Sequence, residues 1–165
     1  MGTLPKCSRR PLPDVVIRRA KKKDLIGLGD RLRQEDKDEI LAGSGLNPQM
    51  AISLGWKYSF TTYVVLVNGQ AEIVFGAVEG STPNSCVVWM LATKWLESAP
   101  YAFLKQSKPW LTRLMKNKEI AYNWVDVRNM THIRWLDWVG ADFVHLEPEY
   151  GHQKLPFLLF ILRKK

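Results

Sequence analysis

Few residues in this chain have the type and spacing that chemistry at a site requires. His132 follows Asn129 at helical spacing, His145 falls in an expected strand, and His152 falls in a turn. A lone histidine can act as a general base, although it more often makes a structural hydrogen bond. No spacing of histidine, cysteine and acidic residues suggests a metal site, so no metal is expected.

Two glutamates are the remaining candidates for proton transfer. Glu72 and Glu79 bound one expected strand, and either carboxylate could act as a general base. The simpler interpretation is that both face solvent. The sequence alone leaves the two interpretations open.

The elements that would position these residues follow from the hydrophobic pattern. β-branched runs predict strands, apolar residues at helical spacing predict helices, and glycine, proline and asparagine mark the boundaries. The sharpest signal is Asn68-Gly69, because that pair favours the tight turn of a β-hairpin. In chain order the pattern predicts a strand at 15–19, a helix from Asp24 to Leu41, a helix from Pro48, strands at 62–67, 72–78 and 86–92, a helical stretch that kinks or restarts near Pro109, a strand at 120–127, a helix at 131–139, and strands at 143–146 and 156–162.

This order predicts a single α/β domain over residues 14–165. It should hold a mixed, mostly antiparallel sheet of six or seven strands, with about four helices on the two faces. Residues 1–13 carry charge and three prolines and are predicted to form a flexible basic leader. The chain is 46% hydrophobic and 24% charged, which is ordinary for a globular domain. Its apolar runs are too short to cross a bilayer, so no membrane partner is expected.

Positive charge gathers at the N-terminal end. The net charge is +8, and a basic segment can bind DNA or an acidic partner, or simply improve solubility. No aromatic residues alternate with these bases to form a stacking platform. The candidate contacts are Arg9, Arg10, Arg18, Arg19, Lys21, Lys22 and Lys23.

The segment 129–140, NMTHIRWLDWVG, resembles a late motif of the GNAT family of acetyltransferases. An asparagine can satisfy loose backbone groups where a strand passes into a helix, and a glycine eases the exit from that helix. Together with the element order, the motif indicates a GNAT-like fold. The matching positions are Asn129, Ile133, Arg134, Val139 and Gly140.

A narrower resemblance covers the C-terminal third of the chain. The stretch 123–136, followed by VGADF at 139–143, is similar to the internal virion protein A family of short-tailed phages. Members of that family are small GNAT-like proteins tied to particle assembly. The resemblance implies a virion component or assembly factor, found in the particle or in the cytoplasm of the infected host cell. Its partners would be other phage structural proteins or a second copy of the chain.

The resemblance also marks departures from an active acetyltransferase. Active members hold the diphosphate of coenzyme A with a glycine-bearing loop, whereas the matching stretch 93–101 has no glycine and includes the acidic Glu97. Leu136 stands where the family often has a tyrosine that protonates the departing thiolate. The resemblance therefore implies a non-catalytic protein with no cofactor.

In that interpretation two tryptophans of the late helix contribute a contact surface. Trp135 and Trp138 flank Leu136, so at least one of them should face away from the sheet. Tryptophan is a common anchor of protein interfaces. The competing interpretation is that both pack beneath neighbouring loops.

Two alternative functions remain open. The first is an acyl-CoA-dependent N-acetyltransferase with an atypical CoA loop, which would bind acetyl-CoA. The second is a basic nucleic-acid-associated or host-takeover protein that acts through the N-terminal arm. If the chain is an acetyltransferase, the cofactor-binding candidates are Lys94 and Asn129, and the catalytic candidates are Glu72, Glu79, His132 and His145.

Overall fold

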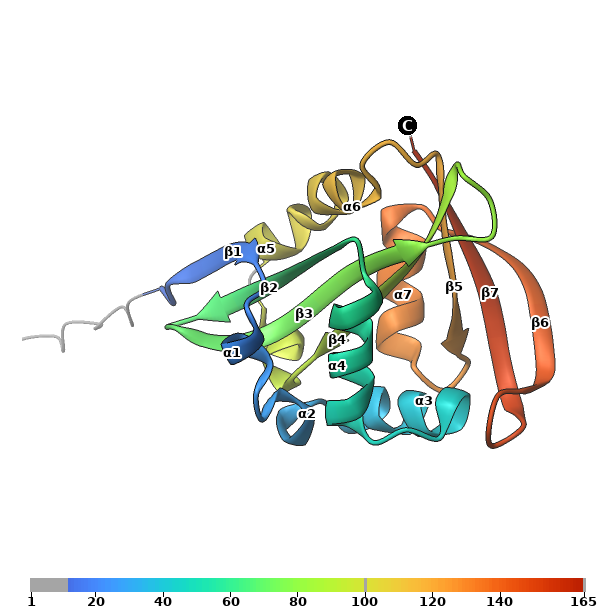
Figure 1. Ribbon diagram of the computed structural model, residues 1–165, viewed down its shortest axis with the longest axis horizontal. Helices are drawn as coiled ribbons and strands as arrows, with labels where there is room; N and C mark the ends of the chain where they lie inside the picture. Colours follow the sequence, from blue (N-terminus) through green and yellow to red (C-terminus); the bar gives the residue numbers. More distant parts are fainter. Residues whose placement is uncertain (1–11, 100, 165) are drawn as a thin grey trace, which may run out of the picture.

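A seven-stranded sheet forms the centre of the computed structural model, which describes residues 12–99 and 101–164 (Figure 1). The strand order is β1-β2-β3-β4-β5-β7-β6, and of the neighbouring pairs only β4 and β5 run parallel. The prediction of a single mixed α/β domain is confirmed. The strands are β1 (Val15–Arg19), β2 (Thr61–Val67), β3 (Gln70–Glu79), β4 (Ser85–Ala92), β5 (Ile120–Asp126), β6 (Asp142–Tyr150) and β7 (Leu155–Arg163). The helices are α1 (Lys22–Leu25), α2 (Leu28–Arg31), α3 (Gln34–Ser44), α4 (Pro48–Tyr58), the 3₁₀ helix η1 (Lys94–Ser98), α5 (Tyr101–Lys105), α6 (Ser107–Met115) and α7 (Met130–Val139).

The hairpin between β2 and β3 turns where the sequence predicts. Asn68 and Gly69 both have positive φ, at 49° and 83°. Two left-handed residues in a two-residue loop match the right-handed twist of the flanking strands. The hairpin therefore follows from local chemistry alone.

The predicted single helix from Asp24 to Leu41 is wrong, because three short helices occupy that stretch. Gly27 has a φ of +72° and separates α1 from α2. After α2 the chain bridges from Leu32 to Thr93, and the Arg33 N–H donates to the Ala92 carbonyl at 2.9 Å. These bonds to the end of β4 replace helical hydrogen bonds, which a local pattern does not reveal.

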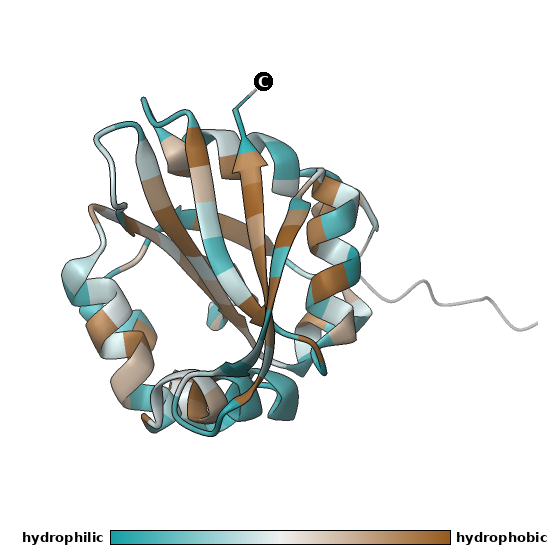
Figure 2. Ribbon diagram, turned by 90° about the vertical axis from the view of Figure 1, so that its right-hand side faces the viewer, coloured by the Kyte–Doolittle hydropathy of each residue, from teal (hydrophilic) through white to brown (hydrophobic). Residues whose placement is uncertain are grey.

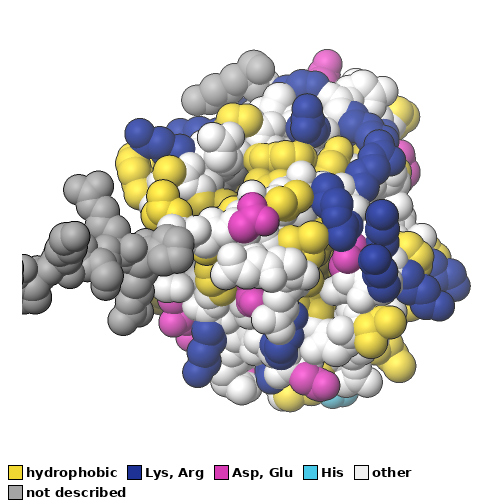
Figure 3. Space-filling view, turned by 90° about the vertical axis from the view of Figure 1, so that its left-hand side faces the viewer, with side chains coloured by type: hydrophobic (Ala, Val, Ile, Leu, Met, Phe, Trp, Pro, Cys, Tyr) yellow, Lys and Arg dark blue, Asp and Glu magenta, His cyan; other side chains and the backbone are white. Residues whose placement is uncertain are grey.

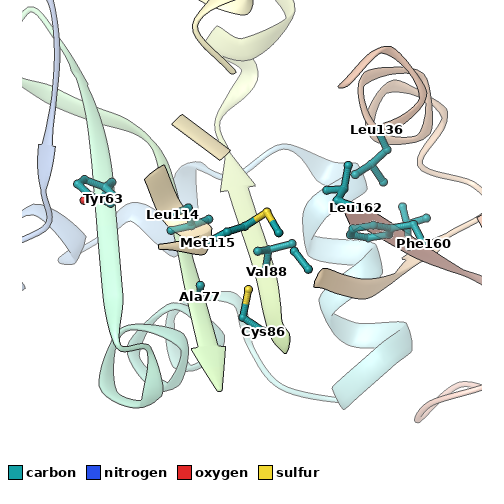
Figure 4. Packing of buried hydrophobic residues seen from close by; sticks show 11 residues of the cluster. Tyr63, Ala77, Cys86, Val88, Leu114, Met115, Leu136, Phe160 and Leu162 are labelled. Carbon is teal, nitrogen blue, oxygen red and sulfur yellow. The ribbon is translucent and has the colours of Figure 1, made fainter. Parts of the chain in front are cut away.

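The sheet carries a hydrophobic core on each face. On one face α1, α2 and α4 bury Leu25, Leu28 and Ile52 against β2 and β3. On the other, α6 and α7 pack over β4 and β7, where Cys86, Val88, Leu114, Leu136 and Phe160 meet (Figure 4). Figure 2 shows strands with long apolar stretches at the centre of the fold and helices of mixed hydropathy around them.

The segment 129–140 forms the helix α7, which begins one residue before the predicted start and ends at the predicted residue. The Asn129 Oδ1 accepts from the His132 N–H at 3.3 Å, and Gly140 ends the helix with a φ of +94°. The side chain of Leu136, in the middle of α7, is buried. The strand predicted at 143–146 is longer than expected. As β6 it runs on to Tyr150, so the turn before β7 spans only residues 151–154.

Candidate functional site

The parallel strands β4 and β5 pair only at their beginnings. Their register covers three residue pairs and ends at Val87 and Tyr122, beyond which the strands diverge (Figure 1). Continued pairing would join the Trp124 N–H to the Val88 carbonyl. Instead the Asn123 side chain lies between them: its Nδ2 donates to the Val88 carbonyl at 2.8 Å, and its Oδ1 accepts from the Trp124 N–H at 2.8 Å. The side-chain amide of Asn123 thus replaces the first backbone hydrogen bond that the diverging strands lack.

At the far end of the gap, two acids on α3 cap the free strand edges. The Ala92 N–H donates to Asp36 Oδ2 at 2.8 Å, and the Asp126 N–H donates to Glu39 Oε2 at 3.3 Å. Because alternate residues of a strand point their backbone groups to the same side, the N–H and C=O of Met90 point into the middle of the gap. A ligand with an amide group can hydrogen-bond there.

A cavity of about 370 Å³ passes through the sheet at this gap. That volume is within the range of small-molecule sites. Its walls come from both faces of the sheet, and they are mostly apolar. Trp110, Leu114, Trp135 and Leu136 line the side of α6 and α7, and Glu39, Trp124, Tyr150 and Phe157 line the side of α3.

Two titratable groups meet inside this cavity. Burial raises the pKa of Glu39 to about 8, and the nearby Asp36 adds to the shift, although a hydrogen bond from Asn129 opposes it. Burial lowers the pKa of His132 to about 4. Glu39 Oε1 lies 3.9 Å from His132 Nδ1, which is too far for a hydrogen bond. Near pH 7 the cavity therefore holds a mostly neutral carboxyl beside a neutral imidazole.

A buried ion pair holds these groups in place. Arg33 Nη2 donates to Asp36 Oδ1 at 2.6 Å, and both side chains are almost fully buried. The Asn129 Nδ2 donates to Glu39 Oε2 at 3.0 Å, which ties α7 to α3. The carboxyl of Glu39 is thus fixed by two donors that come from different elements.

The stretch after β4 does not fit a diphosphate. The Trp95 N–H donates to Thr93 Oγ1, the Leu96 N–H donates to the Thr93 carbonyl, and the Ala99 N–H donates to the Leu96 carbonyl. Amides used in this way cannot surround phosphate oxygens. The Thr93 hydroxyl also bonds the Glu72 carboxylate, which places a negative charge at the same point.

The structure separates the acids and histidines that the sequence singled out. Glu72 is held by Thr93 and Arg31, and Glu79 pairs with Lys118 at 2.5 Å at the other end of β3. His145 is exposed on β6. None of these three side chains lines the cavity, so His132 is the one candidate base among the four that does. Of the two cofactor-binding candidates, Lys94 is exposed on η1 and does not line the cavity, and Asn129 acts as the N-terminal cap of α7.

Sequence reasoning missed Glu39. It ends a charged run on α3 that consists of four acids and one lysine, a pattern that is typical of a solvent-facing helix. Its burial comes from contacts with Asp126 and Asn129, which are 87 and 90 residues away in the chain. No local signal distinguishes it from its neighbours Glu35 and Asp38.

The two tryptophans of α7 lie in different surroundings, and the prediction that they form a contact surface stays a prediction. The Trp135 Nε1 donates to Ser107 Oγ at 3.1 Å, and the ring lines the cavity. Trp138 is 39% exposed, with Lys108 Nζ 4.9 Å from its ring centroid. Only Trp138 is available as a surface anchor.

The basic N-terminal segment is partly engaged within the fold. Arg9 and Arg10 lie outside the described residues. Arg18 donates two hydrogen bonds to Asp24, at 2.7 and 2.8 Å. Figure 3 looks onto the β1 end of the sheet, where lysine and arginine side chains form a band along one side. The exposed bases of the segment are Arg19, Lys21, Lys22 and Lys23.

The described part of the chain has neither a membrane-spanning helix nor a metal-binding cluster. In residues 12–99 and 101–164 no helix is long and apolar enough to span a membrane. The same residues contain no group of three or more histidine, cysteine and acidic side chains that could hold a metal ion.

Comparison with solved structures identifies the fold as that of the GNAT acetyltransferases. A GNAT-family acetyltransferase from Streptococcus pneumoniae superposes with a TM-score of 0.62 and 14% identity, over 92% of this chain and all of the other. A putative acetyltransferase from Salmonella typhimurium, solved with its cofactor acetyl-CoA, gives 0.66 and 12%, over 90% and 93%. The aminoglycoside acetyltransferase AAC(6′)-Ib, solved with coenzyme A, gives 0.64 and 15%, over 92% and 95%.

At these identities the likeness establishes the fold and nothing finer. No protein-family model and no curated sequence matches the chain. Nothing in the comparisons supports the narrower resemblance to the internal virion proteins of phages.

Proposed function

We propose that this chain transfers an acyl group from a thioester to an amine, with Glu39 as the base. The observation that carries the proposal is the gap between β4 and β5, where the free backbone groups of Met90 open onto a cavity that crosses the sheet. Such a passage lets a donor and an acceptor approach one reacting point from opposite faces. The acetyltransferase fold of the structural neighbours supports the same reaction class.

The residues of the cavity suit the chemistry. The amine nitrogen attacks the thioester carbonyl carbon, so that a C–N bond forms as the C–S bond breaks. The surplus proton of the nitrogen passes to the ionised form of Glu39, whose pKa of about 8 is close to that of an efficient base at neutral pH. The sulfur leaves as a thiolate and takes a proton from solvent. Because a thiol has a pKa of about 8.5, this departure does not require a donor at Leu136.

The donor is recognised by its amide-bearing thiol arm rather than by a diphosphate. An extended arm with amide groups matches the free N–H and C=O of Met90 and the apolar walls around them. A diphosphate would meet the internally bonded amides of 93–99 and the carboxylate of Glu72. We therefore infer that S-acetylpantetheine and acetyl-CoA bind with similar affinity.

Calorimetric titration with both thioesters tests this proposal. Similar affinities, together with acetylation of an added amine, are the expected result. The variant Leu111→Trp should abolish binding by filling the cavity, while Leu41→Trp, at an exposed position, should not. Binding of acetyl-CoA but not of S-acetylpantetheine would show that a diphosphate site exists. Absence of binding to both would refute the transferase proposal.

A non-catalytic role in a phage particle is the second candidate. The internally bonded amides of 93–99 favour it, because they remove the usual means of holding coenzyme A. The partners would be other phage structural proteins or a second copy of the chain, with the exposed Trp138 as an anchor. Mass spectrometry of purified particles tests this role.

A basic arm that binds DNA or an acidic partner also stays a prediction.

A further inference from the structure

Three aromatic rings form one end of the cavity, on the side of α3. Trp124 of β5 stacks on Tyr150 of β6, with ring centroids 4.7 Å apart and planes inclined by 29°. Tyr150 packs in turn on Phe157 of β7, at 4.6 Å. We call these three rings the aromatic lobe. They present flat apolar surface next to the carboxyl of Glu39, which lies on the facing helix.

The turn between β6 and β7 fixes this lobe against α3. The N–H groups of His152 and Gln153 donate to the carbonyls of Gly43 and Ala42, at 3.1 and 3.0 Å. These bonds satisfy carbonyls at the end of α3 that would otherwise lack partners. Gly151 makes the approach possible: its φ is +67°, and an added Cβ would lie 2.5 Å from the Gly43 carbonyl oxygen. The aromatic lobe is thus held against α3, one helical turn from Glu39.

The charges around the lobe select the ligand. Among the described residues that line the cavity, Glu39 is the one acid, and none is lysine or arginine. A cation gains from the faces of aromatic rings as well as from a carboxylate. A second cationic group in the same ligand would be buried without a partner, which is costly. An anionic ligand would find no lysine or arginine in this lining to offset its charge.

We propose that the acceptor is a monoamine carried on a flat, apolar body, with its nitrogen at Glu39 and its body against Trp124 and Tyr150. This inference rests on the proposed acyl transfer and names its acceptor class. It excludes polyamines and sugar amines, because the lobe offers one acid and few polar groups. The arrangement also places the nitrogen on the face of the sheet opposite α6 and α7.

Binding of three probes tests the acceptor class. Tryptamine, indole-3-propionate and spermidine are titrated into the full chain by calorimetry, alone and with saturating pantetheine. Tryptamine should bind at least about tenfold more tightly than either other probe, since one hydrogen bond to a charged group is worth that much. Glu39→Gln should weaken tryptamine by about tenfold or more, and Trp124→Leu should weaken it as well. The matched control Glu149→Gln, at an exposed acid of β6, should leave it unchanged.

The possible failures differ from those of the acyl-transfer proposal. Equal or tighter binding of spermidine or indole-3-propionate overturns the acceptor class, as does an unchanged affinity in Glu39→Gln. So does the absence of tryptamine binding under both conditions. If tryptamine binds as expected but is never acetylated, the acceptor site stands and the transferase proposal fails. If spermidine is acetylated and tryptamine is not, the transferase stands and this inference fails.

Discussion

The side-chain amide of Asn123 donates to the Val88 carbonyl at 2.8 Å and bridges the two strands where their pairing ends. Its oxygen accepts from the Trp124 N–H, so one side chain satisfies a backbone group on each strand. Asn123→Ala should lower the free energy of unfolding by about 1–3 kcal/mol, because two partly buried polar groups lose their partner. Denaturant unfolding measures the change. Asn117→Ala, at an exposed position, is the control, and an equal effect in both variants would contradict the role of the bridge.

Glu39 should make the protein less stable as the pH rises. Its pKa is raised from 4.5 to about 8 on folding, so between these values the unfolded chain loses a proton that the folded one keeps. The contribution is full below about pH 4.5 and is lost as the pH approaches 8, with a slope of up to about 1.4 kcal/mol per pH unit. His132 acts in the opposite sense below about pH 6.5, so unfolding free energies of the natural protein should decline between about pH 6.5 and 8 and stay flatter there in Glu39→Gln.

Several other groups face Glu39 and bear on how the measured slope is assigned. They are Asp36 on its own helix, Asp126 on β5, Asn129 and His132 on α7, and Tyr150 on β6. Glu35→Gln, at an exposed position of the same helix, should retain the slope of the natural protein. A slope that survives Glu39→Gln would assign the effect to another group.

His132 should have the opposite effect at acidic pH. Burial lowers its pKa from 6.5 to about 4, so the unfolded chain binds a proton that the folded chain rejects. The contribution of His132 to stability is therefore full above about pH 6.5 and is lost as the pH falls toward 4. Glu39 acts in the opposite sense over part of this range, so the effect shows as a difference between proteins. In thermal unfolding from pH 6.5 to 4, the acid limb of His132→Gln should lie above that of the natural protein, whereas His145→Gln, at an exposed position, should keep the natural limb. An acid limb that is identical in all three proteins would rule out His132 as its source.

Gly151 should tolerate substitution less well than Gly69. Both have positive φ, at 67° and 83°, which strains any other residue by about 1 kcal/mol. Only at Gly151 does an added Cβ meet backbone, 2.5 Å from the Gly43 carbonyl oxygen, while nothing lies within 4 Å at Gly69. Gly151→Ala should therefore cost at least about 1 kcal/mol more than Gly69→Ala in denaturant unfolding. Gly151→Ala should also weaken tryptamine binding, because the lobe would move away from α3. Equal costs for the two variants would show that the turn moves freely.

Most of the strands, the β2–β3 hairpin and the helix α7 could be predicted from the amino-acid sequence. These elements depend on neighbours in the chain: Asn68-Gly69 turns because both residues accept left-handed φ, and Asn129 and Gly140 bound α7 through bonds within a few residues. The acetyltransferase fold followed from that order of elements together with the 129–140 motif.

The location of the site, in contrast, follows from contacts between segments that are far apart in the chain. The divergence of β4 from β5 depends on how Asn123 meets Val88, and the buried carboxyl of Glu39 depends on donors at Asp126 and Asn129. The sequence pointed to Glu72 and Glu79 because they stand on an expected strand, whereas Glu39 resembles its solvated neighbours. Burial is set by packing between segments far apart in the chain, so the pattern around Glu39 carries no trace of it.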